Sequence, residues 1–315
     1  MKKIIAIGEA LIDMIPSDSG CDMGSVSSFA PMVGGAPANV CGTYTSLGGQ
    51  AEMITQLGDD PFGHKILKEF EKYNIGTEHI SLTNVANTSL AFVALKEDGN
   101  REFSFYRKPG ADMLLDKGWI KEEWFEECYA LHFCTVDLGD FPMKKAHDAA
   151  IKYALKNNAL ISFDPNLRFP LWDNLDDLKK VVWEYLPSAH ILKIADEELD
   201  FICGCTDIKE ALPSLFKGNV ELVLYTEGSK GASAFTKNAS ASATCAKVKA
   251  IDTTGAGDAF IGSFLYQLAR DEVHDLSSLS ADRLQEYLEF SNRYCGISVQ
   301  KHGALASYPS LEEMK

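Results

Sequence analysis

The sequence predicts an α/β protein, with a mostly parallel sheet covered by helices on both faces. Short apolar runs alternate with longer amphipathic segments along most of the chain, and that order is typical of strand–helix–strand units. Residues 88–106 differ, because two β-type runs flank an Asp-Gly turn and predict an antiparallel hairpin. A hairpin inserted into such a domain is a candidate lid over a ligand site.

The apolar runs predict buried strands, and the segments between them show helical spacing. Strands are expected at residues 3–8, 161–163, 190–194 and 221–226. Helices are expected at residues 60–75, 143–157, 175–186, 258–270 and 283–300. The first of these helices has Asp60 as its expected N-cap and Pro61 in its first turn, which are common choices at those positions.

Length and composition exclude several classes of protein. The chain has 315 residues, of which 46% are hydrophobic, so one large domain can bury a core without disulfides or a structural metal. A formal net charge of −15 gives no general attraction for nucleic acid or anionic membranes. The eight cysteines form no C-x-x-C pair, and no histidine spacing completes a zinc site. We expect a cytoplasmic protein without nucleic-acid or membrane partners, because no apolar run approaches the roughly 20 residues of a bilayer span and the N-terminus is unlike a signal peptide.

Residues 252–260, DTTGAGDAF, precede and begin the helix expected at 258–270. Gly255, Ala256 and Gly257 are small enough to bring backbone N–H groups against a phosphate, and a helix N-terminus favours an anion. The same four residues, GAGD, would also suit a plain helix start. Neither the dinucleotide fingerprint nor the Walker A pattern occurs in the chain.

The acid that ends this loop makes sense if phosphate is transferred and not merely held. Phosphoryl transfer to an alcohol needs donors around the developing charge and an acceptor for the hydroxyl proton. The N–H groups of Ala256, Gly257 and Asp258 would supply the donors, and the Asp258 carboxylate would take the proton. The loop therefore suggests a kinase.

Two motifs carry a resemblance to a known family. DTTGAGDAF resembles the C-terminal signature of the PfkB/ribokinase-like carbohydrate kinases, and GGAPANV at residues 34–40 resembles their N-terminal signature. The resemblance extends over nearly the whole chain, including DPNLR, TEGSKG and KHGA. It implies one doubly wound, ribokinase-like α/β domain over residues 1–315, with a β-lid formed by about residues 12–32 and 86–110. Sugar would bind under the lid, and ATP beside the phosphate loop.

The resemblance also implies a set of sugar-binding residues. These are Asp13, Gly34, Gly35, Asn39, Arg107, Asn166 and Arg168. The surrounding strings resemble the fructokinase branch most, so fructose is the expected acceptor. Similar strings occur in 2-keto-3-deoxygluconate kinases, where an arginine can hold the substrate carboxylate. That kinase stays open as an alternative, as does a non-catalytic sugar or nucleotide sensor, although a sensor has no use for the Asp258 base.

On the nucleotide side, the resemblance implies ATP and Mg²⁺ as cofactors, with K⁺ as the candidate monovalent ion. The matching ATP-binding positions are Lys193, Thr226, Gly228, Gly231 and Asn292. Glu198 would act on Mg²⁺ through water, but Ala195 stands where the family usually has Asn. The monovalent-cation loop would involve Asp252, Thr254, Gly303 and Ser307. A homodimer is the candidate assembly.

Overall fold

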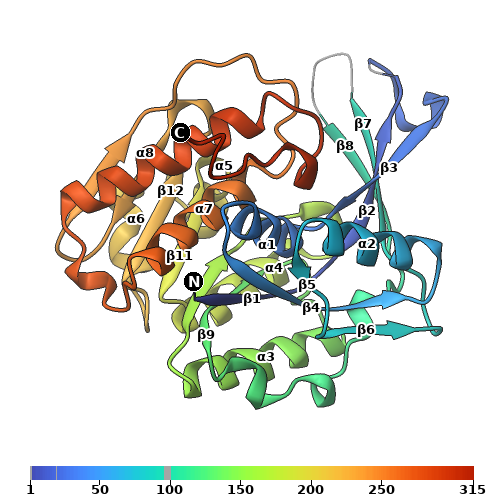
Figure 1. Cartoon of the computed structure of the whole chain (residues 1–315), viewed down its shortest axis with the longest axis horizontal. Coiled ribbons are helices and arrows are strands. Elements are labelled where there is room, and N and C mark those ends of the chain that lie inside the picture. The colour runs from blue at the N-terminus through green and yellow to red at the C-terminus, as the bar shows by residue number, and fades with distance from the viewer. Residues whose placement is uncertain (1, 19, 96–100) are drawn as a thin grey trace.

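A ten-stranded sheet forms the centre of the protein, in a computed structural model that describes residues 2–18, 20–95 and 101–315 (Figure 1). The order along its main path is β14-β13-β12-β11-β10-β9-β1-β4-β5, and β6 pairs with β4. Strands β13 and β14 are antiparallel to their neighbours, and the other pairings are parallel. The bounds are Lys3–Ile7 (β1), Gln50–Gly58 (β4), Ile75–Gly76 (β5), Ile80–Thr83 (β6), Cys128–Cys134 (β9), Leu160–Asp164 (β10), Ile191–Ala195 (β11), Leu222–Thr226 (β12), Ala232–Phe235 (β13) and Ser240–Ala243 (β14).

The direction in which strands are added reverses between β1 and β9. From β1 the chain builds β4 to β6 on one side, and then it returns to place β9, β10, β11 and β12 in sequence on the other. In open α/β sheets, ligands bind outside the carboxyl ends of the strands at such a switch point. The residues that follow β1, β9 and β10 are therefore the first place to look for a site.

Helices cover both faces of this sheet. Along β1, Ile4 and Ala6 pack into the core on one face, whereas Ile5 and Ile7 pack on the other. The first face is covered by α1 (Ala36–Ser46), α2 (Pro61–Lys72), α7 (Ala256–Arg270) and α8 (Ala281–Ser298). The second is covered by α3 (Pro142–Lys156), α4 (Leu175–Tyr185), α5 (Asp196–Cys203) and α6 (Ile208–Leu215). This arrangement confirms the predicted α/β fold.

The predicted helices agree with the observed ones to within a few residues. Asp60 caps α2, because its Oδ1 accepts hydrogen bonds from the backbone N–H groups of Phe62 at 2.9 Å and Gly63 at 2.8 Å. The helix expected from residue 258 begins at Ala256 instead. Asp258 is therefore already in the first turn of α7, where its backbone N–H has no intrahelical acceptor.

A second, four-stranded sheet stands beside the main body, at the upper right of Figure 1. Its order is β3-β2-β7-β8, with bounds Leu11–Pro16 (β2), Phe29–Gly34 (β3), Leu90–Leu95 (β7) and Arg101–Tyr106 (β8). The antiparallel pairing of β7 with β8 confirms the predicted hairpin, and its expected Asp-Gly turn lies outside the described residues. Because β2 follows β1 after only three residues, the small sheet starts from the carboxyl edge of the central sheet.

Candidate active site

Buried carboxyl groups gather where β1, β9 and β10 end. Glu9 follows β1, Asp137 follows β9, and Asp164 is the last residue of β10. All three are almost fully buried. Buried acids are uncommon unless they are paired or functional, so this edge is the candidate active site.

Asp258 is held at this edge by side chains from two other elements. The Asn39 amide, on α1, donates to Asp258 Oδ2 at 2.9 Å, and the Asn166 amide, after β10, donates to Oδ1 at 3.2 Å. Asp258 is only 6% exposed, and this burial raises its pKa against the lowering effects of the two amides and of the charges on Arg168 and Lys193. The result is a fixed carboxylate with a higher proton affinity than a free aspartate.

The loop before Asp258 requires glycine at two positions. Gly255 has φ +74°, and a Cβ there would lie 2.5 Å from the Tyr308 hydroxyl oxygen. A Cβ on Gly257 would lie 3.2 Å from Lys193 Nζ, so the lysine amine lies directly against the loop. A side chain at either position would press on Tyr308 or Lys193 at the N-terminus of α7.

The backbone donors of this loop differ slightly from the predicted set. The Ala256 N–H already donates to the carbonyl oxygen of Thr253 at 3.2 Å. The N–H groups of Gly257 and Asp258 belong to the first turn of α7, where a helix provides no acceptor. With the Lys193 amine beside them, these two groups form a setting that fits a phosphate.

Lys193, on β11, forms a buried ion pair with Asp164. Its Nζ lies 3.2 Å from Oδ1 and 3.0 Å from Oδ2 of the carboxylate. Burial alone would lower the pKa of Lys193, but the charge of Asp164 outweighs it and raises that pKa, so the amine stays positive. Burial raises the pKa of Asp164 to about 7 even though Lys193 acts to lower it. Asp164 therefore holds the positively charged Lys193 amine in place next to Gly257.

The predicted sugar residues Asp13, Gly34 and Gly35 lie around the start of α1. A Cβ on Gly34 would collide with the Asp13 carboxylate, and one on Gly35, which has φ +112°, would collide with the backbone carbonyl of Glu9. Glu9 Oε1 accepts a hydrogen bond from the Ala36 N–H at 2.9 Å. Burial raises the pKa of Glu9 to about 7, against the lowering effect of that N–H group. These contacts fix the first turn of α1 at the end of β1.

Arg107, at the base of the small sheet after β8, is enclosed by acids. Its Nε lies 2.7 Å and its Nη2 2.6 Å from Asp112 Oδ2, and Nη2 also donates to Asp137 Oδ1. The Phe141 ring centroid lies 5.7 Å from the guanidinium carbon. Arg107 is thus buried and paired with protein carboxylates.

Arg168 is less enclosed. It is half-buried, and its Nη1 donates to the backbone carbonyl of Leu167 at 3.1 Å. Its charge is close enough to act on the pKa of Asp258. The adjacent Asn166 has φ +46°, a conformation that asparagine adopts more readily than most residues, and it aims the amide at Asp258.

Of the predicted nucleotide residues, Lys193 lies on β11, and the other four lie at or after the end of β12 or next to β14. Thr226 ends β12, and Gly228 and Gly231 follow with positive φ angles. A Cβ on Gly231 would collide with the Ala243 carbonyl, and the same oxygen accepts a hydrogen bond from the Asn292 amide at 2.8 Å. The structure therefore brings these residues together, with Asn292 fastening β14 to α8.

Glu198 is already engaged as a backbone cap. Its Oε1 accepts from the Leu167 N–H at 2.7 Å, and its Oε2 accepts from the Ala195 N–H at 2.9 Å. Among residues 2–18, 20–95 and 101–315, no group of three His, Cys, Asp or Glu side chains could hold a metal ion. A magnesium ion here would need phosphate and water oxygens for most of its ligands, as Mg²⁺ commonly does.

The predicted monovalent-cation residues tie two loops together. Asp252 Oδ1 accepts from the N–H and hydroxyl of Thr254 at 2.9 and 2.7 Å, and Asp252 Oδ2 accepts from the Gly303 N–H at 2.9 Å. The Ser307 hydroxyl donates to the Ala304 carbonyl at 2.8 Å. The bond from Gly303 to Asp252 therefore holds the loop before α7 against the loop after α8, and the other bonds shape each loop locally.

A family model described as pfkB family carbohydrate kinase matches residues 1–311. The chain belongs to this family. It is 38% identical over 309 residues to a probable fructokinase-2 of Arabidopsis thaliana, which covers 98% of this chain and 93% of that protein. It is equally identical over 312 residues to a fructokinase-2 of Solanum lycopersicum, covering 98% and 94%.

Solved structures of fructokinases share the fold of this carbohydrate kinase. A fructokinase of Xylella fastidiosa with bound ATP superposes with a TM-score of 0.91 and 31% identity, covering 99% of this chain and 96% of that one. A fructokinase of Vibrio cholerae O395, in a form with bound fructose, ADP and calcium, gives 0.88 and 30%, covering 100% and 98%. The kinase is therefore an ATP-dependent sugar phosphotransferase of ribokinase-like fold. In the described part of the chain, no helix is long and apolar enough to cross a membrane.

Sequence reasoning missed four acids of the kinase's site. They are Glu9, Asp112, Asp137 and Asp164. Asp164 and Glu9 could have been found, because each directly follows an apolar strand and so falls at a carboxyl edge. Asp112 begins a short 3-10 helix and Asp137 lies in a turn, so neither follows a strand directly, and only their contact with Arg107 places them at the site.

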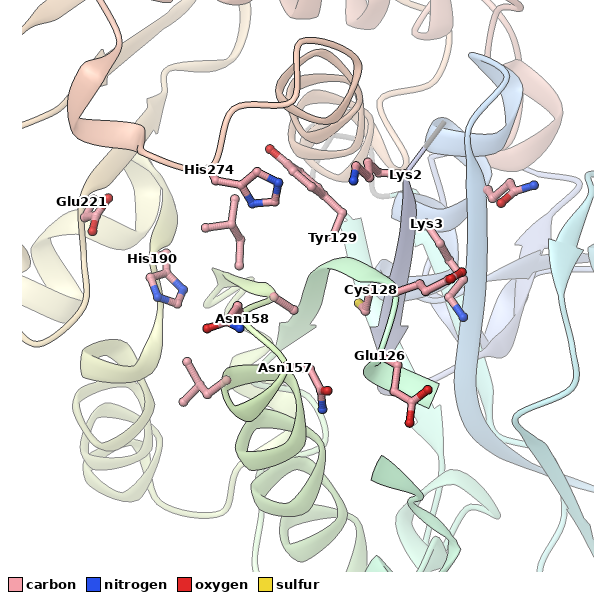
Figure 2. A pocket seen from close by; sticks show the side chains of 15 residues that line it. Lys2, Lys3, Glu126, Cys128, Tyr129, Asn157, Asn158, His190, Glu221 and His274 are labelled. Carbon is pink, nitrogen blue, oxygen red and sulfur yellow. The ribbon is translucent and has the colours of Figure 1, made fainter. Parts of the chain in front are cut away.

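The kinase also has an open hollow at the opposite edge of the central sheet (Figure 2). It encloses about 830 Å³ near the amino ends of β1, β9 and β10, and its lining includes Lys3, Tyr129, His190 and His274. None of the predicted site residues lines it. It is separate from the edge that carries Asp258.

Proposed function

We propose that this kinase is a fructokinase, which transfers the γ-phosphoryl group of ATP to a hydroxyl of fructose with Asp258 as the base. One observation carries the proposal. Asp258 lies in the first turn of α7, next to backbone N–H groups that have no intrahelical acceptor, and the amides of Asn39 and Asn166 hold its buried carboxylate. Fructose as the acceptor is supported by the fructokinase relatives over nearly the full chain.

In this mechanism, Asp258 accepts the proton of the attacking hydroxyl as the bond to phosphorus forms. The raised pKa of Asp258 makes it a better acceptor than a free aspartate. The Gly257 and Asp258 N–H groups and the Lys193 amine stabilise the charge on the transferred phosphoryl group. Bound Mg²⁺ would neutralise phosphate charge, and Glu198 is the residue proposed to contact it through a water molecule. The Asp252 loop is the proposed position for K⁺.

The small sheet β3-β2-β7-β8 is proposed to close over the sugar as a lid. It starts at the carboxyl edge through β2, and β8 leads directly into Arg107 at the same edge. Closure would exclude water, which otherwise competes as phosphoryl acceptor. The homodimer and the cytoplasmic location stay predictions from the sequence.

The test is a coupled assay of ADP release with fructose, 2-keto-3-deoxygluconate, ribose and adenosine as acceptors. The highest kcat/KM is expected with fructose. A preference for 2-keto-3-deoxygluconate would contradict the choice of sugar and leave the kinase assignment intact. Absence of turnover with every acceptor, in protein that still binds ATP and sugar, would favour the sensor.

A further inference from the structure

Arg107 lies among more negative charge than it can neutralise. Its guanidinium contacts the carboxylates of Asp112 and Asp137, and its charge also acts on the nearby carboxyl of Glu9. One cation therefore faces three acids. Even with Glu9 protonated, this group of four residues keeps a net negative charge.

The contacts with Asp112 and Asp137 fix the guanidinium as well as neutralising it. Asp112 Oδ2 receives both Nε and Nη2, while its Oδ1 accepts the Ser89 hydroxyl at 2.5 Å. Asp137, which follows β9, accepts from Nη2. The guanidinium is 4% exposed at the level of the side chain. A substrate carboxylate that needed Nε or Nη2 of Arg107 would have to displace one of these acids.

The Asp137 charge is incompletely compensated. Among the described residues, its Oδ2 has no hydrogen-bond partner, although the atom is buried. A buried carboxylate oxygen without a partner keeps its negative field in a region of low dielectric, where it acts strongly on a nearby charge. Such a field repels an anion and has no comparable effect on a neutral polyol.

This acidic group lies beside the proposed sugar site. Glu9, whose pKa responds to both Arg107 and Asp112, accepts a hydrogen bond from Ala36 in the first turn of α1. Asn39 is three residues further on, about one helical turn along the axis, and it holds Asp258. The acids and the reacting carboxylate are therefore connected through one turn of α1.

We propose that Asp137 is a specificity-determining residue, which occupies Arg107 and adds uncompensated negative charge so that the kinase takes neutral sugars and rejects sugar acids. Asp137 acts here through Arg107 and through its field, as a positioning residue. The proposal rests on the proposed function, because it concerns the acceptor of that same site. It names the chemical class of the acceptor, a neutral polyhydroxy sugar, without depending on fructose in particular.

Asp137→Asn tests the proposal, since it removes one charge at nearly constant shape. The readout is the ratio of the KM for fructose to the inhibition constant of 2-keto-3-deoxygluconate, so that a general loss of activity in the variant does not count as a change of specificity. The inhibition constant of 2-keto-3-deoxygluconate against the sugar should fall by at least about tenfold, the size expected for gaining a hydrogen bond between charged groups. The gain should shrink at high salt, because screening weakens charge interactions.

Asp112→Asn serves as the second variant if Asp137→Asn folds poorly. It likewise removes one negative charge next to Arg107. The amide oxygen can still accept from Arg107 while the new amide N–H donates to the Ser89 hydroxyl, which can accept as well as donate, so the same direction of change is expected. Asp148→Asn is the matched control, because Asp148 is an exposed acid on α3 that accepts the Tyr185 hydroxyl. It should leave every constant unchanged.

Unchanged affinity for the sugar acid in folded Asp137→Asn and Asp112→Asn would overturn the proposal. So would a wild-type enzyme that prefers the acid over every neutral sugar. If the wild type prefers ribose over fructose, the fructose assignment fails separately, and the same comparison with ribose as the neutral sugar still tests Asp137.

Discussion

Replacing Asp258 by asparagine separates the proposed base from the structure that holds it. In the folded protein, the Asp258 carboxylate accepts one hydrogen bond from the Asn39 amide and one from the Asn166 amide. Asp258→Asn would turn one of these contacts into a donor facing a donor. Asn39 Oδ1 has no partner among the described residues, so a rotation of the Asn39 amide by half a turn restores the bond. The site is therefore expected to keep its shape.

The effect of Asp258→Asn on stability has a definite sign. Because burial raises the folded-state pKa of Asp258, ionising it disfavours the folded state at pH values above the unfolded-state pKa. An amide has no such cost, so the melting temperature at neutral pH should stay equal or rise. At pH below the unfolded-state pKa, both proteins should be similarly stable.

The effect of Asp258→Asn on rate should be large, because an amide cannot take the hydroxyl proton. A positioned base is worth about 10²–10⁴ in rate, or roughly 2.7–5.4 kcal/mol of transition-state stabilisation. The coupled ADP-release assay should therefore show kcat lower by two or more decades. Titration calorimetry should show ATP and sugar affinities within a few-fold of wild type. Turnover within tenfold of wild type, with binding intact, would refute the assignment of Asp258 as the base.

Three further changes test other parts of the site. Gly257→Val should weaken ATP binding and turnover, because the valine Cβ would lie 3.2 Å from the Lys193 amine. Gly296→Ala is the control, since the space around its Cβ position is open. Normal ATP affinity in Gly257→Val would show that phosphate does not approach this backbone. Hydrogen exchange in β7 and β8 should slow when saturating sugar is added, and equal exchange with and without sugar would argue against a lid. Burial raises the folded-state pKa of Glu9 from 4.5 to about 7. The free energy of unfolding of the wild type, measured in urea, should therefore fall relative to that of Glu9→Gln as the pH rises from about 4.5 to 7, by on the order of 1–3 kcal/mol. If the two proteins show the same pH dependence, Glu9 titrates normally.

The sequence by itself determined the architecture and predicted the candidate base. Alternating apolar and amphipathic segments specify strands and helices locally, and this is why the bounds of α2, α3 and α4 could be predicted within a few residues. The loop at residues 252–258 could be predicted to bind phosphate because its small residues and its acid are adjacent in the chain. These signals depend on residues that are close in the chain, so they can be recognised without knowledge of the fold.

Only the tertiary structure decided how the side chains are paired. Asn39 and Asp258 are 219 residues apart, and no periodicity links them. Arg107 could be read from the sequence as a free cation for a substrate, whereas the fold encloses it between Asp112 and Asp137. Glu198 is predicted from the sequence to act on magnesium through water, and only the fold shows that both its oxygens also accept from backbone N–H groups. Charge pairing depends on distances across elements that the topology brings to one edge, and that information is absent from any short stretch of chain.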